Sequence, residues 1–337
     1  MIKNKKITIV ISVLIGIIIV IAITNYKKLI IYKNSILNIF ANKINNWDGL
    51  SLVEIPSVYD ETIQKAYFYQ TTQRDKKPLI VSLHSWSSDY SEEDRMALLF
   101  KNEDWNYIHP DFRGANNKPD AMLSDAVIQD IDDSIEYAIN NANVDLNNIV
   151  VVGSSGGGLA ALGIYLRSSY KLKLCMAWNP ISDLETWYYQ SKYSSTKYWQ
   201  DIHRATNSGD TFNSAEAFRR SPIHYSFSTD KSDTHLKLYA GINDGYNGTV
   251  SIIHTISFFN KIVGEIETED TAIIPNEDII SLLSRSINLN NSNDFIDNRE
   301  VIYRKTYDNI DILIFNGNHE ILIDYAYRSI KEICLRD

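Results

Sequence analysis

The sequence Asn-Ile-Val-Val-Val-Gly-Ser-Ser-Gly-Gly-Gly, residues 148–158, places a short apolar run directly before a turn made of small residues. The run predicts a buried strand, and the residues from Leu159 to Arg167 predict a helix after the turn. Ser155 has glycine two positions before it and two positions after it, which matches the pattern Gly-x-Ser-x-Gly. Because glycines there let strand and helix approach closely, the pattern predicts that Ser155 is a nucleophile held in a strained backbone conformation.

A glycine-rich turn before a helix is also typical of phosphate-binding loops. The sequence after Gly153 contains no Gly-Lys-Ser/Thr and does not match Gly-x-Gly-x-x-Gly. The position of the turn in the middle of the chain also disfavours a dinucleotide loop, which is expected on the first strand of its sheet. The nucleophile interpretation is therefore favoured.

Strand-like and helix-like segments alternate on both sides of this turn, which predicts a mainly parallel central sheet with helices on both faces. This is the α/β class, and with the serine turn it predicts the α/β-hydrolase fold. We expect strands at 52–55, 66–70, 78–83, 105–109, 148–152, 172–178, 235–240 and 310–315, and helices at 124–141, 159–167, 249–263 and 320–334. In the helix at 124–141, Asp130, Asp132, Asp133 and Glu136 alternate with an isoleucine stripe and are expected to face solvent.

Two segments break the alternation and are expected to be insertions over the carboxyl ends of the strands, at about 182–225 and 265–309. An aromatic set lies in or next to the first insertion. It fits either a lid that lines a pocket or a small core of the insertion's own, and the sequence does not choose between them. The set is Trp178, Trp187, Tyr188, Tyr189, Tyr193, Tyr198 and Trp199.

A serine nucleophile needs a base, and the base needs an orienting carboxylate. In this fold the chain order is serine, then acid, then histidine. Asp244 follows the strand at 235–240 and His319 follows the strand at 310–315, each in a glycine-containing loop. Asp183 is the rival acid. The other histidines considered fit a catalytic role less well: His84, His109, His203, His224 and His254.

The expected oxyanion hole consists of two backbone N–H groups. One comes from Gly156, the residue after the nucleophile. The second comes from the loop after the strand at 78–83, where Ser85 and Trp86 are equal candidates. No cofactor and no metal is required for the expected chemistry.

The amino-terminal residues differ from the rest of the chain. Residues Ile7–Thr24 carry no charge and, at 1.5 Å per residue, a helix of this length spans about 27 Å, close to the thickness of a bilayer core. We expect a membrane anchor, or else a signal segment, at 1–28, a linker at 29–47 and a catalytic domain at 48–337. Lysines flank the apolar run on both sides, and the balance weakly favours a catalytic domain outside the cytoplasm, secreted if the segment is cleaved.

Charge excludes one class of partner. The first 33 residues carry six lysines and no acid, which leaves 27 Lys and Arg against 42 Asp and Glu in the remainder. A domain this acidic disfavours nucleic-acid binding. We expect a small-molecule, peptide or glycan ester substrate, and contact with the membrane through the amino-terminal segment alone. Cys175 and Cys334 predict neither a disulfide framework nor a zinc site.

The chain from about Leu52 to its end resembles the catalytic domain of the prolyl oligopeptidase family of α/β-hydrolases. The resemblance rests on five motifs: Pro110-Asp111-Phe112-Arg113-Gly114, the turn at 153–158, Ser221-Pro222-Ile223, Gly241-Ile242-Asn243-Asp244-Gly245 and Gly317-Asn318-His319-Glu320. It implies Ser155, Asp244 and His319 as a catalytic triad, and a serine hydrolase that cleaves a peptide or ester bond through an acyl-enzyme.

The chain departs from the family pattern in two ways. No β-propeller precedes the expected catalytic domain, and the segment between Asp244 and His319 is longer than a minimal member needs. Two other functions therefore stay open: a carboxylesterase or carbohydrate (acetyl or feruloyl) esterase, and a catalytically silent scaffold anchored to the membrane.

Overall fold

The computed structural model describes residues 46–267, 269, 271–286 and 294–335. The chain divides into two compact units, Met1–Asp48 and Gly49–Asp337, and the second contains all the helices and strands given below. The predicted membrane segment at 7–24 lies outside the described residues. Among the residues that are described, no helix is long and apolar enough to cross a bilayer. The membrane anchor therefore stays a prediction from the sequence.

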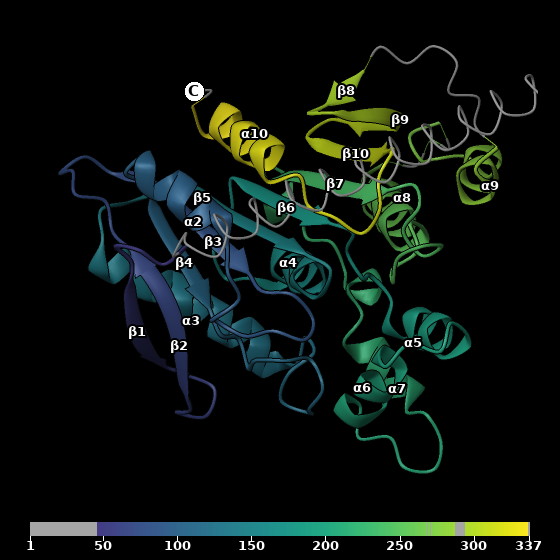
Figure 1. Ribbon diagram of the computed structural model, residues 1–337, viewed down its shortest axis with the longest axis horizontal. Coiled ribbons are helices and arrows are strands. Elements are labelled where there is room, and N and C mark those ends of the chain that lie inside the picture. The colour runs from purple at the N-terminus through teal and green to yellow at the C-terminus, as the bar shows by residue number, and fades with distance from the viewer. Residues whose placement is uncertain (1–45, 268, 270, 287–293, 336–337) are drawn as a thin grey trace, which may run out of the picture. The chain divides into compact units, whose positions relative to one another are not determined.

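In the described part of the chain, ten strands form one sheet in the order β1-β2-β4-β3-β5-β6-β7-β10-β9-β8 (Figure 1). The strands from β4 to β10 in this order run parallel, whereas β1, β2 and β9 join as antiparallel neighbours. Their bounds are β1 Ser51–Pro56, β2 Ile63–Tyr69, β3 Lys77–Leu83, β4 Asn106–Pro110, β5 Val144–Ser154, β6 Leu174–Trp178, β7 His235–Gly241, β8 Phe295–Ile296, β9 Arg299–Tyr307 and β10 Ile310–Phe315.

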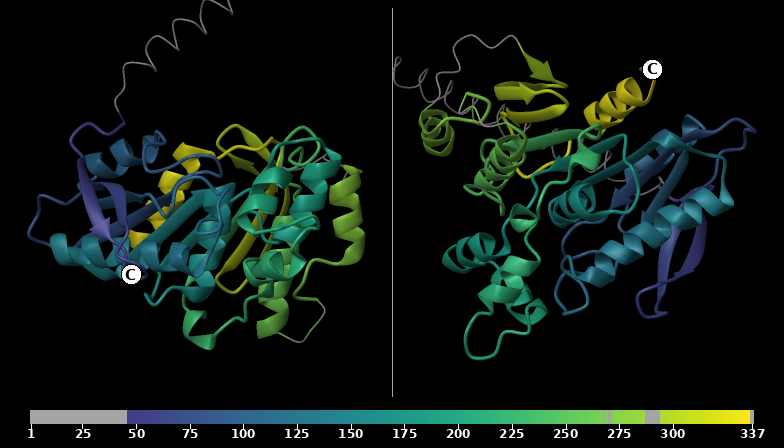
Figure 2. Two further views of the ribbon diagram at one scale, coloured as in Figure 1. Left: turned by 90° about the horizontal axis from the view of Figure 1, so that it is seen from below. Right: turned by 180° about the vertical axis from the view of Figure 1, so that it is seen from behind.

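Helices cover both faces of the sheet (Figures 1 and 2). Helices α2 and α10 pack together on one face, and α3, α4 and α8 lie on the other. The helical elements are α2 Arg95–Asn102, α3 Asp125–Asn141, α4 Gly156–Arg167, α5 Leu184–Tyr193, α6 Tyr198–Ala205, α7 Ser214–Arg219, α8 Ile253–Ile266, α9 Asn276–Ser284 and α10 Ile323–Leu335, with 3₁₀ turns η1 Pro222–His224 and η2 Thr229–Lys231. The predicted α/β-hydrolase fold is confirmed.

The central strands are apolar because helices bury them on both sides. Every residue of β6 is buried, and so is every residue from Ile149 to Gly153 of β5. Helix α4 packs directly on these strands, and all its residues from Gly156 to Leu166 are buried. Its small side chains allow this close contact, which fixes the position of the turn between β5 and α4.

The prediction for the acidic stripe of α3 was wrong for three of its four members. Asp130, Asp132 and Asp133 are 2%, 7% and 5% exposed, and only Glu136 faces solvent. Each buried carboxylate has polar partners elsewhere in the chain, which the spacing of residues along the helix cannot reveal. Asp132 accepts hydrogen bonds from Ser168 and Ser169 beyond α4, and Asp133 accepts one from the backbone N–H of Val58.

The second expected insertion only partly lies above the sheet. It contains α9, but its last part forms β8 and β9, and β9 pairs antiparallel with β10. The alternation of exposed and half-buried residues in β9 is typical of a strand near a sheet edge. These polar strands extend the sheet beyond β10.

Asp130 belongs to a buried ion-pair network centred on Arg113. The Arg113 side chain is 2% exposed; its Nε donates to Asp130 Oδ2 at 2.5 Å, and its Nη1 donates to Asp60 Oδ2 at 2.7 Å. Ser57 hydrogen bonds to both Arg113 and Asp130. The network ties the loop after β4 to the end of β1 and to α3.

We expect Arg113→Met to lower the free energy of unfolding by about 3–5 kcal/mol, because it leaves the fully buried Asp130 carboxylate without its cation. The measurement is urea unfolding, compared between variants in which the slope of the unfolding free energy against urea concentration is unchanged. Arg95→Met is the matched control. It breaks the exposed pair with Asp324 at 2.8 Å and should change stability by less than about 1 kcal/mol. Equal effects of the two substitutions would contradict the prediction.

Candidate active site

Ser155 occupies a strained turn at the carboxyl end of β5. Its backbone has φ 57° and ψ −115°, a conformation that residues with a side chain rarely adopt. The turn needs glycine on both sides. A Cβ on Gly153 would lie 2.2 Å from the Gly157 carbonyl oxygen, and a Cβ on Gly157 would lie 2.2 Å from the Leu83 carbonyl oxygen. The glycine spacing noted in the sequence is thus a requirement of backbone packing.

Asp244 and His319 meet above the ends of β7 and β10. The two strands are parallel neighbours, so the loops that follow them lie side by side. His319 Nδ1 lies 2.6 Å from Asp244 Oδ2, and the Asp244 side chain is fully buried. The second carboxylate oxygen, Oδ1, accepts hydrogen bonds from the backbone N–H groups of Gly245 and Val250 at 2.9 and 3.1 Å. These bonds fix the carboxylate that orients the imidazole.

Gly248 makes room for this pair. A Cβ at that position would lie 2.3 Å from Asp244 Oδ1 and 3.1 Å from His319 Cβ. The loop after β7 can therefore fold over the carboxylate only with glycine at 248. The sequence showed glycines around Asp244, but it could not show that one of them borders the histidine.

The rival acid and two of the remaining histidines, His254 and His203, have other partners. Asp183 caps the amino end of α5, where its side chain accepts hydrogen bonds from the backbone of Glu185 and Thr186. His254 is buried against Ser182 and Gln190, and burial lowers its pKa to about 4. His203 hydrogen bonds to the carbonyl of Gly209 in the first insertion.

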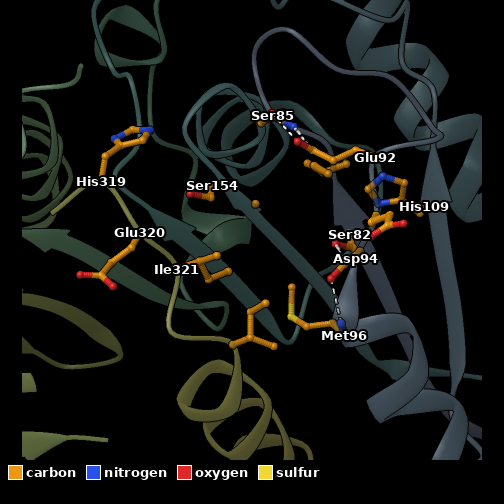
Figure 3. Close-up of a pocket in the computed structure, with 14 residues that line it drawn as sticks. Ser82, Ser85, Glu92, Asp94, Met96, His109, Ser154, His319, Glu320 and Ile321 are labelled. Carbon is orange, nitrogen blue, oxygen red and sulfur yellow. Dashed lines mark hydrogen bonds between the residues drawn. The ribbon is translucent and has the colours of Figure 1, made fainter. Parts of the chain in front are cut away.

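A cavity of about 340 Å³ lies between the loop after β3, which contains Ser85, and the loop after β10, which contains His319. Figure 3 shows Ser154, directly before Ser155 in the chain, and His319 on its wall. Apolar and acidic side chains complete the lining, which consists of Ser82, Leu83, Ser85, Glu92, Glu93, Asp94, Met96, His109, Gly153, Ser154, His319, Glu320, Ile321 and Ile323. The cavity takes none of its lining from the first insertion.

Ser155, whose hydroxyl is the predicted nucleophile, is half-buried at the turn. Among the hydrogen bonds of the described residues, none joins this hydroxyl to the His319 ring. Catalytic hydrogen bonds often shorten only in the complex with substrate. The acid–histidine contact is thus formed in this structure, and the serine–histidine contact is not.

The backbones of Gly156 and Trp86 lie in close contact next to Ser155. A Cβ on Gly156 would lie 2.5 Å from both the N and the Cα of Trp86. The N–H of Gly156 is the first of helix α4, so it has no acceptor within the helix. The positive end of the helix dipole adds to the attraction for negative charge at this point.

Their hydrogen bonds distinguish Ser85 from Trp86 as candidates for the second oxyanion donor. The Ser85 N–H donates to Glu92 Oε2 at 2.6 Å, and the Trp86 carbonyl accepts from the Asn116 N–H at 2.9 Å. Within the described residues, the Trp86 N–H has no hydrogen-bond partner. The geometry therefore favours Trp86 over Ser85 as the second donor. Sequence reasoning did not identify Glu92, because nothing in its local sequence marks it as a partner of Ser85.

The aromatic insertion packs against the Trp86 side chain. Trp86 Nε1 donates to Asp201 Oδ2 at 3.1 Å, and the Trp86 ring meets the Trp187 ring edge-on at 4.6 Å. Trp187 and Tyr188 are 0% and 3% exposed and form a core with Tyr198 and Phe212. The insertion thus has a small core of its own, and that core includes the indole of the oxyanion loop.

In the described part of the chain, no group of three or more His, Cys, Asp or Glu residues is arranged to hold a metal ion. Both cysteines are buried, and burial raises the pKa of the Cys175 thiol well above its ordinary value. Neither thiol lines the cavity.

Comparison with known proteins identifies the family of the chain. A model of the prolyl oligopeptidase family matches residues 93–278, more than half of the chain, a range that includes Ser155 and Asp244. No curated protein sequence matches the chain.

The solved structures compared here are much longer than this chain. An acylaminoacyl peptidase in complex with Z-Gly-Gly-Phe-chloromethyl ketone matches with a TM-score of 0.57 at 16% identity, over 84% of this chain and 40% of its own. A puromycin-hydrolyzing peptidase of Mycobacterium tuberculosis matches with 0.56 at 13%, over 84% and 38%. Prolyl oligopeptidase B from Galerina marginata matches with 0.54 at 12%, over 85% and 36%. The chain therefore spans about two fifths of the length of these proteins.

We expect Asp244→Asn to lower kcat by about 10³–10⁴-fold, because an amide no longer stabilises the imidazolium or fixes the tautomer of His319. Steady-state hydrolysis of an activated ester measures the effect. Asp183→Asn is the control and should stay within about threefold of the wild type, because Asp183 only caps α5. A larger loss in the Asp183 variant would reassign the acid.

Proposed function

The chain belongs to the prolyl oligopeptidase family of serine hydrolases, and on this basis we propose that it cleaves peptide bonds through an acyl-enzyme on Ser155. One observation carries the proposal: the 2.6 Å contact between His319 Nδ1 and a fully buried Asp244 carboxylate, with His319 on the wall of a cavity that Ser154, the neighbour of the strained Ser155, also lines. A carboxylate held in this way orients the imidazole so that Nε2 is free to accept a proton.

In the proposed reaction, His319 Nε2 removes the proton of the Ser155 hydroxyl as Ser155 Oγ attacks the substrate carbonyl carbon. The tetrahedral intermediate collapses when the same imidazolium gives its proton to the leaving amine. Water then attacks the acyl-enzyme by the same route and releases the acid. The serine–histidine hydrogen bond forms when substrate displaces solvent from the cavity.

Negative charge develops on the carbonyl oxygen during both steps. The N–H groups of Gly156 and Trp86 are the proposed donors to this oxygen. Their proximity and the partners already bound by Ser85 support the assignment. Donors fixed in advance stabilise the transition state because they need not reorganise during reaction.

We expect Ser155→Ala to abolish covalent labelling by a fluorophosphonate probe, because the probe reacts with the activated serine oxygen. Ser154→Ala is the matched control and should still be labelled, since Ser154 lacks the glycine spacing and the strained backbone. In-gel fluorescence and mass spectrometry of the labelled peptide provide the measurement. Labelling that persists without the Ser155 hydroxyl would overturn the proposal, and an unlabelled wild type would favour the silent scaffold.

The lining of the cavity favours a substrate whose acyl group or amino-acid side chain is uncharged. Leu83, Met96 and Ile321 provide apolar wall, whereas Glu92 and Glu93 add carboxylates. A carboxylate-bearing substrate group would be repelled there. The three solved structures named above carry peptidase titles, and one holds a peptide chloromethyl ketone, which supports an amide rather than an ester substrate.

We expect apolar aminoacyl-naphthylamides to be cleaved with a higher kcat/KM than p-nitrophenyl acyl esters, once each is corrected for its spontaneous hydrolysis. Acidic aminoacyl-naphthylamides should be poorer substrates by at least about tenfold, a difference of about 1.4 kcal/mol in transition-state binding. A clear preference for acyl esters or for acetylated or feruloylated glycans would instead identify the chain as an esterase.

Attachment to the membrane through residues 7–24 is a separate proposal that rests on the sequence alone. Its support is the length of the uncharged run and the lysines on either side. In that arrangement the acidic catalytic unit would be held near the membrane by the anchor, because its own charge opposes contact with anionic lipid.

A further inference from the structure

The histidine loop, residues 316–322 between β10 and α10, has to reach back across the sheet. In the strand order, β6 and β7 separate β5, which precedes Ser155, from β10, which precedes His319. Adjacent strands lie about 4.8 Å apart, so β5 and β10, three spacings apart, are separated by about 14 Å. The loop that carries His319 must therefore extend over β7 and β6 before the imidazole can approach the serine hydroxyl.

Asn179, directly after β6, binds the histidine loop on this path. The residue is 1% exposed. Its Nδ2 donates to the carbonyl oxygen of Glu320 at 2.8 Å, and its Oδ1 accepts from the N–H of Gly241 at 3.1 Å. Glu320 follows His319 in the chain, and Gly241 ends β7, shortly before Asp244. The Asn179 side chain thus joins the loop of the histidine to the loop of the acid.

The same segment of chain also binds the serine turn between β5 and α4. The N–H of Ser155 donates to the carbonyl oxygen of Trp178 at 2.9 Å. A path of hydrogen bonds through residues 178 and 179 therefore runs from the Ser155 backbone to the Glu320 backbone. Among the hydrogen bonds of the described residues, the bond from Asn179 to Glu320 is the one that joins residues 317–322 to the end of β6 or to the serine turn.

The backbone of Asn179 restricts which residues fit at this position. Its φ is 44°, in the left-handed region that glycine adopts most easily and asparagine or aspartate next. Glycine would satisfy the backbone and make neither side-chain bond. An ionised aspartate would present a second acceptor to the Glu320 carbonyl, which can only accept. Asparagine is the one of these three residues that can bind both loops.

We propose that Asn179 is a positioning residue that holds the histidine loop over β6, within reach of Ser155. The inference rests on the proposed function, since it assigns a role in that reaction. The contact between the acid and the imidazole has its own support, because the Asn243 N–H donates to the Gly317 carbonyl at 3.0 Å and ties those two loops together. Asn179 sets the distance between the imidazole and the serine hydroxyl, the contact that substrate binding completes.

Two variants and one control separate this role from a purely structural one. Asn179→Gly keeps the backbone conformation and removes both side-chain bonds, whereas Asn179→Asp keeps the acceptor for Gly241 and loses the donor to Glu320. Asn106→Asp is the matched control. Asn106 is 0% exposed, and its Nδ2 donates to two backbone carbonyls at the amino ends of β3 and β5, away from the site. The measurements are kcat and KM for an activated ester, the second-order rate of fluorophosphonate labelling and the free energy of unfolding in urea.

We expect kcat and the labelling rate to fall by about 10–10²-fold in both Asn179 variants, with KM within about threefold of the wild type, because a displaced imidazole slows proton transfer and leaves substrate binding intact. Asn106→Asp should lose a comparable part of the unfolding free energy and keep kcat within about threefold of the wild type. Full kcat in Asn179→Asp would place the role at the acid loop and refute the proposal. An equal loss of kcat in the control would refute it as well.

The wild type provides an independent test if the variants fail to fold. In a crystal structure of the enzyme phosphonylated on Ser155, His319 Nε2 should lie about 2.6–3.2 Å from Ser155 Oγ, with the bond from Asn179 to Glu320 kept. An imidazole outside that range, or a loop that reaches the serine only after this bond has broken, would overturn the role of Asn179. A wild type that is not labelled would defeat the proposed function itself, which keeps the two failures distinct.

Discussion

The active site depends on the contact of bare backbone with bare backbone at the turn between β5 and α4. Gly153 faces the carbonyl of Gly157, and Gly157 faces the carbonyl of Leu83, at distances that leave no room for a methyl group. This packing keeps Ser155 in a conformation that an isolated peptide would leave at once. It also sets the start of α4, and with it the direction of the helix dipole and of the first N–H groups. The remaining parts of the site are arranged around a point that the glycines have fixed.

The oxyanion loop is held by successive layers of contact that reach far from the serine. Arg113 is bound by two carboxylates, and the adjacent Phe112 supports the ring of His84. His84 in turn binds the peptide that precedes Trp86. Asp130, Arg113 and His84 are buried, so their interactions are screened little by solvent. The Asp-Phe-Arg-Gly segment, which the sequence offered only as a family likeness, thus has a physical connection to the proposed chemistry.

Local sequence was enough to locate the fold and the three residues of the proposed triad. Ser155 was marked by glycine spacing, and Asp244 and His319 by their places just after apolar runs that predicted strands. Parallel strands bring their carboxyl ends to one edge of the sheet. The positions of Asp244 and His319 after two such strands therefore predicted that the two side chains would lie close together. The roles of the triad residues are still proposals, although their positions are now known.

The interactions that local sequence did not reveal are those between residues far apart in the chain. The buried aspartates of α3 look like an exposed stripe until their partners are known, because periodicity counts them as polar and cannot see Arg113 or Ser168. The partner of Ser85, Glu92, and that of the Trp86 indole, Asp201, carry no motif. Strand β9 was missed because its exposed side chains resemble those of a loop.

The bond between the Trp86 indole and Asp201 makes the first insertion a structural neighbour of the reacting centre, although the insertion contributes nothing to the cavity wall. Through this bond, α6 contacts the residue whose backbone N–H is the proposed second donor to the oxyanion. Substitutions scattered through 182–225 would therefore change turnover while leaving substrate contacts intact. The insertion therefore supports the position of the loop after β3, although it lies outside the cavity.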